Sequence, residues 1–184
     1  MIKYLGWNAK KIKVIPSLRF KKKKKKEFNG YLFVPFNLDN EENYLKMLEE
    51  YLIKMKDKFY LNYLIRIHPL NSNSKKHLKF KEKSKNLISK YLQNKHKKKT
   101  MNNSLFFGSA TGVCIQSLEE GTDIIHFPKN KYLDVFSDKM WPSLNIKQIG
   151  GSIFEYKLKR KNLTFFVNKN KDNFTKYFVP LIKK

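Results

Sequence analysis

The chain of 184 residues has a single cysteine, Cys114, which excludes a disulfide framework and a zinc site built on cysteines. It has only seven glycines, and no run of apolar residues is long enough to cross a membrane as a helix. The first residues lack the apolar run and the small-residue cleavage site of a signal peptide. We therefore expect a cytoplasmic protein, with at most a peripheral contact at the inner face of the membrane.

Arginine is also scarce, although the chain is strongly basic. The formal net charge is +25, and of the 40 basic residues only Arg19, Arg66 and Arg160 are arginines. Base recognition and bidentate phosphate binding favour arginine. A chain rich in Lys, Asn, Ile and Phe is instead typical of an AT-rich coding bias. The composition therefore argues against nucleic acid as the partner, even though phosphate neutralisation drives non-specific binding.

Two lysine clusters, at 21–26 and 95–99, carry much of this charge. Like charges close together along a helix repel, so the first cluster is expected to be a solvated loop. Either cluster would also suit an anionic lipid surface, at about 1 kcal/mol per charge, or a nucleic-acid backbone. A non-catalytic membrane-surface subunit and a basic nucleic-acid-binding protein therefore remain alternatives to the function inferred below.

The length and the hydrophobic fraction of 41% suffice for one domain with a sizeable core. We expect a basic lead-in or interdomain segment at 1–27 and one domain at 28–184. Short apolar runs alternate along the chain with segments whose apolar residues are spaced three or four apart. The runs predict strands at 31–36, 59–67, 105–107 and 123–127, and the spaced segments predict helices at 41–58, 78–92 and 113–119. Later candidates are strands at 146–149, 153–158 and 163–167 and a closing helix at 174–182.

This order predicts an α/β fold with a Rossmann-like parallel sheet flanked by helices. Ligands of such sheets bind at the carboxyl ends of the strands, near a topological switch point. The loops that follow the strands are therefore the places to look for a site.

The first candidate loop is His68-Pro69, directly after the second predicted strand. Pro69 biases His68 towards an extended conformation, which holds its side chain at the rim of the sheet. There the imidazole can donate to a phosphate or stack against a base. The alternative is a histidine whose hydrogen bonds serve the local structure alone.

The second candidate loop spans 107–113 and reads Phe-Gly-Ser-Ala-Thr-Gly-Val. Gly108 lets the backbone approach a ligand closely, and the hydroxyls of Ser109 and Thr111 add donors. The helix that begins near Thr111 points free N–H groups at the same place, which favours an anion. The loop is neither a Walker loop nor a dinucleotide-binding turn. Simple N-capping by Ser109 or Thr111 is the alternative.

Taken together, the two loops resemble the C-terminal nucleotide-binding domain of bacterial GT-B glycosyltransferases of surface carbohydrate biosynthesis. The sialyltransferase, polysialyltransferase and capsule Kdo-transferase group is the most similar part of that family. Its sialyltransferases carry a His-Pro motif and a Ser-Ser/Thr motif that hold the CMP donor. His68-Pro69 matches the first motif, and Ser109-Ala110-Thr111 matches the second with one residue substituted or inserted.

The resemblance implies a single GT-B half-domain that binds a nucleotide-sugar donor, with a CMP-sugar as the first candidate, and no metal or other cofactor. Its nucleotide- and phosphate-binding residues would be His68, Pro69, Gly108, Ser109, Thr111 and Gln116. His68 would contact the departing phosphate, the second loop would cradle it, and Gln116 would hydrogen-bond the ribose.

The same resemblance implies a glycan acceptor and an N-terminal acceptor domain on another chain, because this chain has the length of one half only. That domain would supply the general base, so no catalytic residue is assigned here and little turnover is expected from the chain alone. It would be a fragment, a split subunit or a degenerate relative.

Other reactive side chains are weaker candidates. We expect His77 and His96 to be exposed, His126 to be packed in the core and Cys114 to be an inert buried thiol. The carboxylates Asp134, Asp138 and Glu155 are scattered along the sequence and predict no acid–base pair.

Overall fold

The computed structural model describes residues 30–55, 63–92, 103–109, 111–119, 122–139, 141 and 143–159. The lead-in at 1–27, both lysine clusters, the strand expected at 163–167 and the helix expected at 174–182 lie outside these residues.

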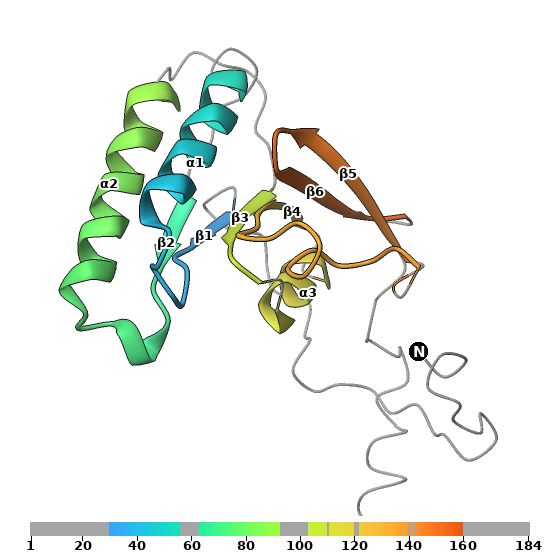
Figure 1. The fold of residues 1–184 in the computed structure, drawn as a ribbon, viewed down its shortest axis with the longest axis horizontal. Helices are drawn as coiled ribbons and strands as arrows, with labels where there is room; N and C mark the ends of the chain where they lie inside the picture. The colour runs from blue at the N-terminus through green and yellow to red at the C-terminus, as the bar shows by residue number, and fades with distance from the viewer. Residues whose placement is uncertain are drawn as a thin grey trace, which may run out of the picture.

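The described chain forms an α/β fold built on one mixed sheet (Figure 1). Its elements are β1 (Gly30–Phe33), α1 (Glu41–Met55), β2 (Tyr63–Arg66), a 3₁₀ helix (Pro69–Asn71), α2 (Lys75–Leu92), β3 (Asn103–Phe107), α3 (Gly112–Glu119), β4 (Asp123–Phe127), β5 (Leu144–Gly150) and β6 (Ile153–Leu158). The strand order is β2-β1-β3-β4-β6-β5. The Rossmann-like arrangement expected from the sequence is confirmed.

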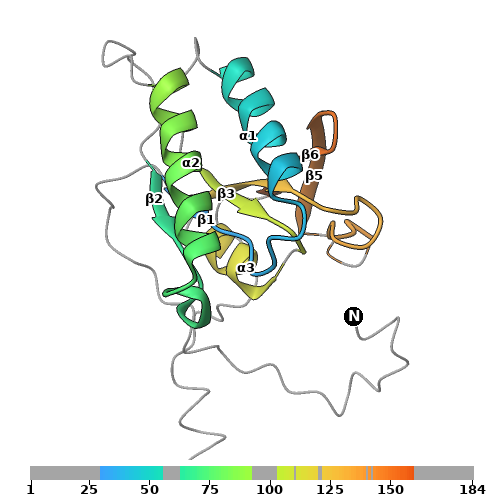
Figure 2. The same ribbon diagram turned by 60° about the vertical axis from the view of Figure 1, so that its left-hand side comes forward.

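Helices cover both faces of the sheet. In Figures 1 and 2, α1 and α2 run side by side over one face, while α3 lies against the other. Successive strand residues point to opposite faces, so Leu105 and Phe107 join the core under α1 and α2. Phe106, between them, joins the core on the α3 side.

The first four strands are parallel, and the chain changes direction at β1. From β1 it crosses to β2 on one side and then returns to β3 and β4 on the other. The loops after β1 and β3 therefore diverge at the carboxyl edge of the sheet, which is the switch point where α/β sheets bind ligands.

The last two strands depart from the parallel sheet expected from the sequence. β6 runs antiparallel to β4, and β5 antiparallel to β6. Only Gly151 and Ser152 separate β5 from β6, and a parallel connection needs a crossover of about a dozen residues. The hairpin closes one edge of the sheet beyond β4.

The first strand and helix show how the sequence sets the local structure. β1 ends at Phe33, earlier than the expected residue 36, because Pro35 has no N–H to continue the ladder. Glu41 and Glu42 stabilise the first turn of α1 by opposing its dipole. The buried face of α1 has the predicted spacing of three and four residues: Tyr44, Met47, Leu48, Tyr51 and Leu52.

A polar cluster is buried at the amino end of β3, opposite the carboxyl edge. The Asn103 side chain donates from Nδ2 to the Tyr51 hydroxyl at 2.9 Å and accepts from the Tyr63 hydroxyl at 2.5 Å. Gly30 lies against the same residue, since a Cβ there would stand 1.6 Å from the Asn103 carbonyl oxygen. The packing around Asn103 at this end of β3 is therefore tight.

Candidate functional site

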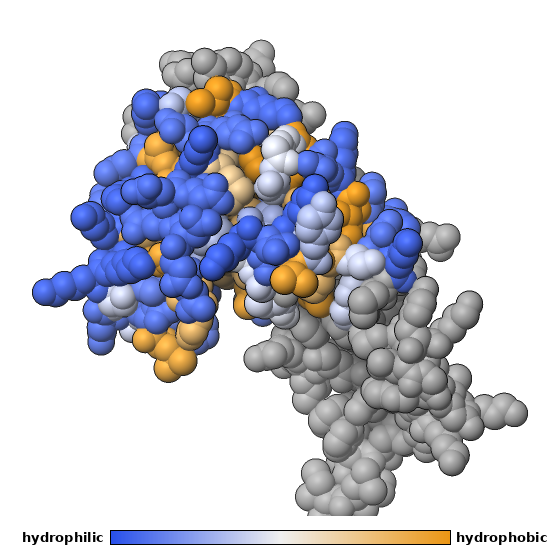
Figure 3. Space-filling view, in the orientation of Figure 1, coloured by the Kyte–Doolittle hydropathy of each residue, from blue (hydrophilic) through white to orange (hydrophobic). Residues whose placement is uncertain are grey.

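A pocket of about 770 Å³ opens at the carboxyl edge of the sheet, between the loops that follow the parallel strands. Its volume lies within the range of about 300–1,000 Å³ that is typical of small-ligand sites. The structure brings all six residues selected from the sequence to its wall: His68, Pro69, Gly108, Ser109, Thr111 and Gln116. Figure 3 shows a notch at the lower end of the described surface, between the α2 side and the α3 side.

Gly108 forms the turn at the end of β3, with a φ of 83° that L side chains rarely adopt. Its N–H donates to the Phe127 carbonyl at 3.0 Å, and its own carbonyl accepts from Nε2 of His126. The N–H of Gly108 is therefore already bonded within the sheet, so a donor to a phosphate has to come from other groups of the loop. Gly108 shapes the loop, while the N–H groups of Ser109 and Gly112 have no acceptor among the described residues.

Thr111 is the N-cap of α3. Its Oγ1 accepts from the Val113 N–H at 3.4 Å, and its carbonyl accepts from the Cys114 N–H at 3.0 Å. The capping alternative thus holds for Thr111. The hydroxyl proton of Thr111 is not used by the cap and remains a donor at the pocket wall.

Ser109 does not cap the helix. Its hydroxyl donates to Oδ1 of Asp134 at 2.7 Å, and Oδ2 of the same carboxylate accepts from the Asn130 N–H at 2.7 Å. Asp134 also lines the pocket, although its place in the sequence did not mark it as a site residue. The sequence separation of 25 residues hides this pair, which forms only because β3 and β4 are neighbours.

His68 has the extended backbone expected from Pro69, with φ −60° and ψ 139°. Its Nδ1 accepts from the Leu70 N–H at 3.3 Å and so caps the 3₁₀ helix. An accepting Nδ1 places the proton of the neutral ring on Nε2, and Nε2 has no partner in the described part of the chain. His68 therefore serves the local structure and still presents one donor at the pocket wall.

Phe36 forms part of the same wall, although no motif in the sequence marks it as a site residue. Its ring meets the imidazole of His68 at 87°, with 5.1 Å between centroids. Its carbonyl accepts from Nε2 of His77 at 3.0 Å and from Nδ2 of Asn71 at 2.9 Å. The expected exposure of His77 is therefore wrong: the ring is buried and, with Ser74 on Nδ1, it fixes the loop after β1.

His126 is buried in β4, as expected, but it also supports the pocket loop. Because Nε2 donates to Gly108, Nδ1 accepts from the Tyr156 hydroxyl at 2.8 Å. That hydroxyl in turn accepts from the Phe136 N–H at 3.2 Å. Burial lowers the pKa of His126 to about 4, so the ring is neutral at neutral pH and keeps this donor–acceptor order.

The charges at the pocket wall balance, in contrast to the chain as a whole. Arg66 and Lys129 oppose Asp39 and Asp134. Burial raises the pKa of Tyr44, and the negative charges of Asp134 and Asp39 raise it further. The pocket is thus a mixed polar site with aromatic walls and not a basic groove.

The remaining candidates lie away from this chemistry. Cys114 is buried on α3 and burial raises its thiol pKa to about 12, which agrees with an inert thiol. Glu155 pairs with Lys157 at 2.9 Å on β6. Within the described residues, no group of His, Cys, Asp and Glu side chains is arranged to hold a metal ion. None of the helices in these residues combines the length and the apolar character needed to cross a bilayer.

Comparison of the chain with protein-family models, with curated proteins and with solved structures finds no match.

Proposed function

We propose that the pocket binds the nucleotide part of a nucleotide-sugar, and that the chain is the donor-binding half of a glycosyltransferase-like protein of bacterial surface polysaccharide biosynthesis. One observation carries the proposal. Residues selected from two separate loops, His68-Pro69 and the 108–116 segment, meet in a single pocket at the switch point of the sheet. Such a position is where α/β sheets bind nucleotides.

The donors that would hold a phosphate come from both loops. His68 offers Nε2–H, Thr111 offers its hydroxyl proton, and the first turn of α3 offers the N–H of Gly112. These groups are fixed before a ligand arrives, by the 3₁₀ cap and by the helix cap. Fixed donors directed at a leaving phosphate would stabilise the charge that develops on it during sugar transfer.

The acceptor side of the reaction lies elsewhere in this proposal. Asp134 and Asp39 are the carboxylates at the described pocket wall, and Asp134 is already held by Ser109 and Asn130. We assign neither carboxylate as the base that activates a glycan hydroxyl. A second domain, on this chain or on another, would bring that base, so the chain alone is expected to bind the donor without turning it over.

Titration calorimetry with CMP, UDP and GDP tests this proposal. We expect one nucleotide to bind selectively, and both His68→Ala and Ser109→Ala to weaken it. Ser109→Ala removes a hydroxyl at the pocket wall that donates to Asp134, so the negative charge of this carboxylate is less compensated opposite a phosphate. Ser152→Ala is the matched control, because Ser152 is exposed in the β5–β6 turn and does not line the pocket.

The proposal fails if the folded chain binds none of the three nucleotides, or if the two pocket variants bind as the Ser152→Ala control does. Steeply salt-dependent binding that all variants share would instead indicate charge-driven attraction, as for a nucleic-acid-binding protein.

A further inference from the structure

The exposed apolar side chains of the described residues are concentrated at the carboxyl edge of the sheet. Eight large apolar side chains are exposed, and five of them follow the ends of the four parallel strands: Phe36 after β1, Leu70 after β2, Val113 after β3, and Tyr132 and Leu133 after β4. The other three, Ile53, Leu64 and Leu78, lie on helices or on an edge strand. We call the first five residues the apolar rim.

The apolar rim lies on the loops that form the pocket. Phe36 and Val113 line the pocket directly, Leu70 follows the lining residue Pro69, and Leu133 precedes the lining residue Asp134. Figure 3 shows hydrophobic surface in orange on both sides of the notch. Scattered single apolar residues are normal on a protein surface, but a set that gathers on the loops around one pocket marks a contact surface.

Three residues of the rim are almost fully exposed. Leu70, Tyr132 and Leu133 have 80%, 81% and 82% of their surface accessible. Transfer of such side chains from water to an apolar phase has a strongly favourable free energy. Their position at the tips of loops therefore suits insertion into the apolar part of a bilayer. A flat protein contact would not require tips on separate loops.

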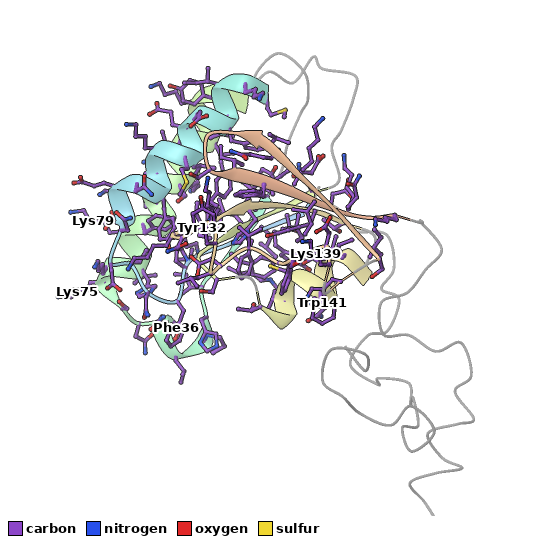
Figure 4. All side chains as sticks on the ribbon, turned by 45° about the vertical axis from the view of Figure 1, so that its right-hand side comes forward. Phe36, Lys75, Lys79, Tyr132, Lys139 and Trp141 are labelled. Atoms are coloured by element: carbon purple, nitrogen blue, oxygen red, sulfur yellow. The ribbon has the colours of Figure 1, made fainter. Side chains whose placement is uncertain are left out.

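Lysines accompany the rim on both sides of the pocket. Lys75, Lys76 and Lys79 occupy the first turns of α2, and Lys129, Lys131 and Lys139 lie in the loop after β4. Figure 4 shows Lys75 and Lys79 along α2 above Phe36, with Lys139 near Trp141 and α3. None of the six forms an ion pair with another described residue. Asp39, Asp134 and Asp138 offset half of this charge.

The combination of apolar tips and lysines that form no ion pair among the described residues distinguishes a lipid surface from a protein partner. Lysine is depleted in protein–protein interfaces, whereas lysine heads reach lipid phosphates while apolar tips enter the acyl boundary. Tyrosine is enriched at the membrane–water interface. In the rim, Tyr132 lies beside a lysine, since Lys131 Nζ is 4.8 Å from the centroid of its ring. We propose that the apolar rim inserts into an anionic lipid bilayer, so that the pocket mouth faces the membrane surface.

This inference goes beyond the nucleotide site and does not depend on it. It assigns insertion into the bilayer to the apolar rim. Lysine clusters elsewhere in the chain could add electrostatic attraction to the lipid, but not insertion. A substitution that removes apolar surface without changing charge therefore separates the two effects.

Vesicle co-sedimentation of the full chain provides the test. The vesicles contain phosphatidylcholine with about one third phosphatidylglycerol, and the variant is Leu70→Ser/Leu133→Ser. We expect it to bind about tenfold more weakly than the wild type. Ile53→Ser/Leu64→Ser is the matched control, because it removes two exposed apolar side chains away from the rim, and it should bind as the wild type does. Thermal melts verify that both variants fold.

Three results would overturn the inference. The wild type could fail to bind anionic vesicles, or the rim variant could bind as tightly as the control. The rim variant could also leave vesicle binding unchanged but dissociate a self-associated wild type in light scattering, which would make the rim a protein–protein surface. Nucleotide titration in the absence of lipid reports on the pocket separately, so failure of one proposal does not imply failure of the other.

Discussion

The imidazole of His126 in β4 donates from Nε2 to the carbonyl oxygen of Gly108 at the end of β3. Gly108 has a positive φ and begins the loop that leads to α3. A buried histidine on one strand thus fixes the turn that follows its neighbour. The contact explains why a polar residue occupies the apolar run of β4.

The contact belongs to a closed ring of interactions. From His126 it continues through the Tyr156 hydroxyl to the main chain at Phe136, in the loop that also carries Asp134. Asp134 accepts a hydrogen bond from Ser109 in the loop after β3, and this bond closes the ring. The two loops on either side of the pocket are therefore held to each other and to the sheet, and we expect them to move as one unit.

The first prediction is a loss of stability in mild acid that is due to His126. Its pKa is about 4 in the folded chain, against an ordinary value of 6.5, so the unfolded chain binds the proton first as the pH falls. The free energy of unfolding should therefore decrease between about pH 6.5 and pH 4, by about 3 kcal/mol in total. Urea denaturation at a series of pH values measures it.

His126→Gln is the control for that prediction, because glutamine does not titrate. The variant should be less stable at neutral pH, since it perturbs the bond to Gly108, but it should lack the histidine-dependent fall. An identical pH dependence in wild type and variant would show that His126 is not the group responsible.

The second prediction concerns the two glycines of the loop. Gly108→Ala places a side chain at a φ of 83° and should destabilise the chain by about 1–2 kcal/mol. Gly112→Ala is the matched control, because a Cβ there meets no atom within 4 Å and alanine favours a helix. Chemical denaturation compares them, and equal stabilities would contradict the strained turn.

The third prediction concerns the buried polar cluster at the amino edge. Asn103→Ala removes the amide to which the Tyr51 and Tyr63 hydroxyls are both bonded, and burial raises the pKa of both phenols, so they stay neutral. We expect a loss of about 3 kcal/mol in unfolding free energy and no change in nucleotide affinity. In a Tyr51→Phe/Tyr63→Phe background the loss should shrink, and an undiminished loss would point to packing instead.

The order of elements was predictable because each has a local signal. The spacing of apolar residues in α1 is a property of the sequence alone, and so are the apolar runs that became β3 and β4. The ends of elements were less predictable. The early end of β1 before Pro35, and the antiparallel direction of β5 and β6, depend on how strands meet in the sheet.

In the candidate site, too, residues with a local signal were predictable and residues placed by long-range contacts were not. His68 and Thr111 were found because each stands beside a proline or at a helix start, which are local signals. Asp134, Phe36 and His77 were missed because they reach the pocket through contacts between distant segments. The resemblance to a glycosyltransferase domain selected positions along the chain, whereas their hydrogen bonds follow from the packing of β3 against β4 and of α2 against the loop after β1.

The fourth prediction is that Asp134→Asn tightens nucleotide binding. The Asp134 carboxylate lies at 2.7 Å from the Ser109 hydroxyl, so its negative charge opposes a phosphate at the same loop. Asparagine keeps the shape but removes the charge: its oxygen can accept from the Asn130 N–H, and its amide nitrogen can donate to the Ser109 hydroxyl oxygen. We expect about fivefold higher affinity in calorimetry, with a larger gain at low ionic strength. Asp138→Asn, an exposed aspartate of the same loop that does not line the pocket, is the control. Weaker binding by Asp134→Asn would instead show that the carboxylate accepts a hydrogen bond from the ligand, which would assign Asp134 to a sugar or ribose hydroxyl and not to the positioning of Ser109.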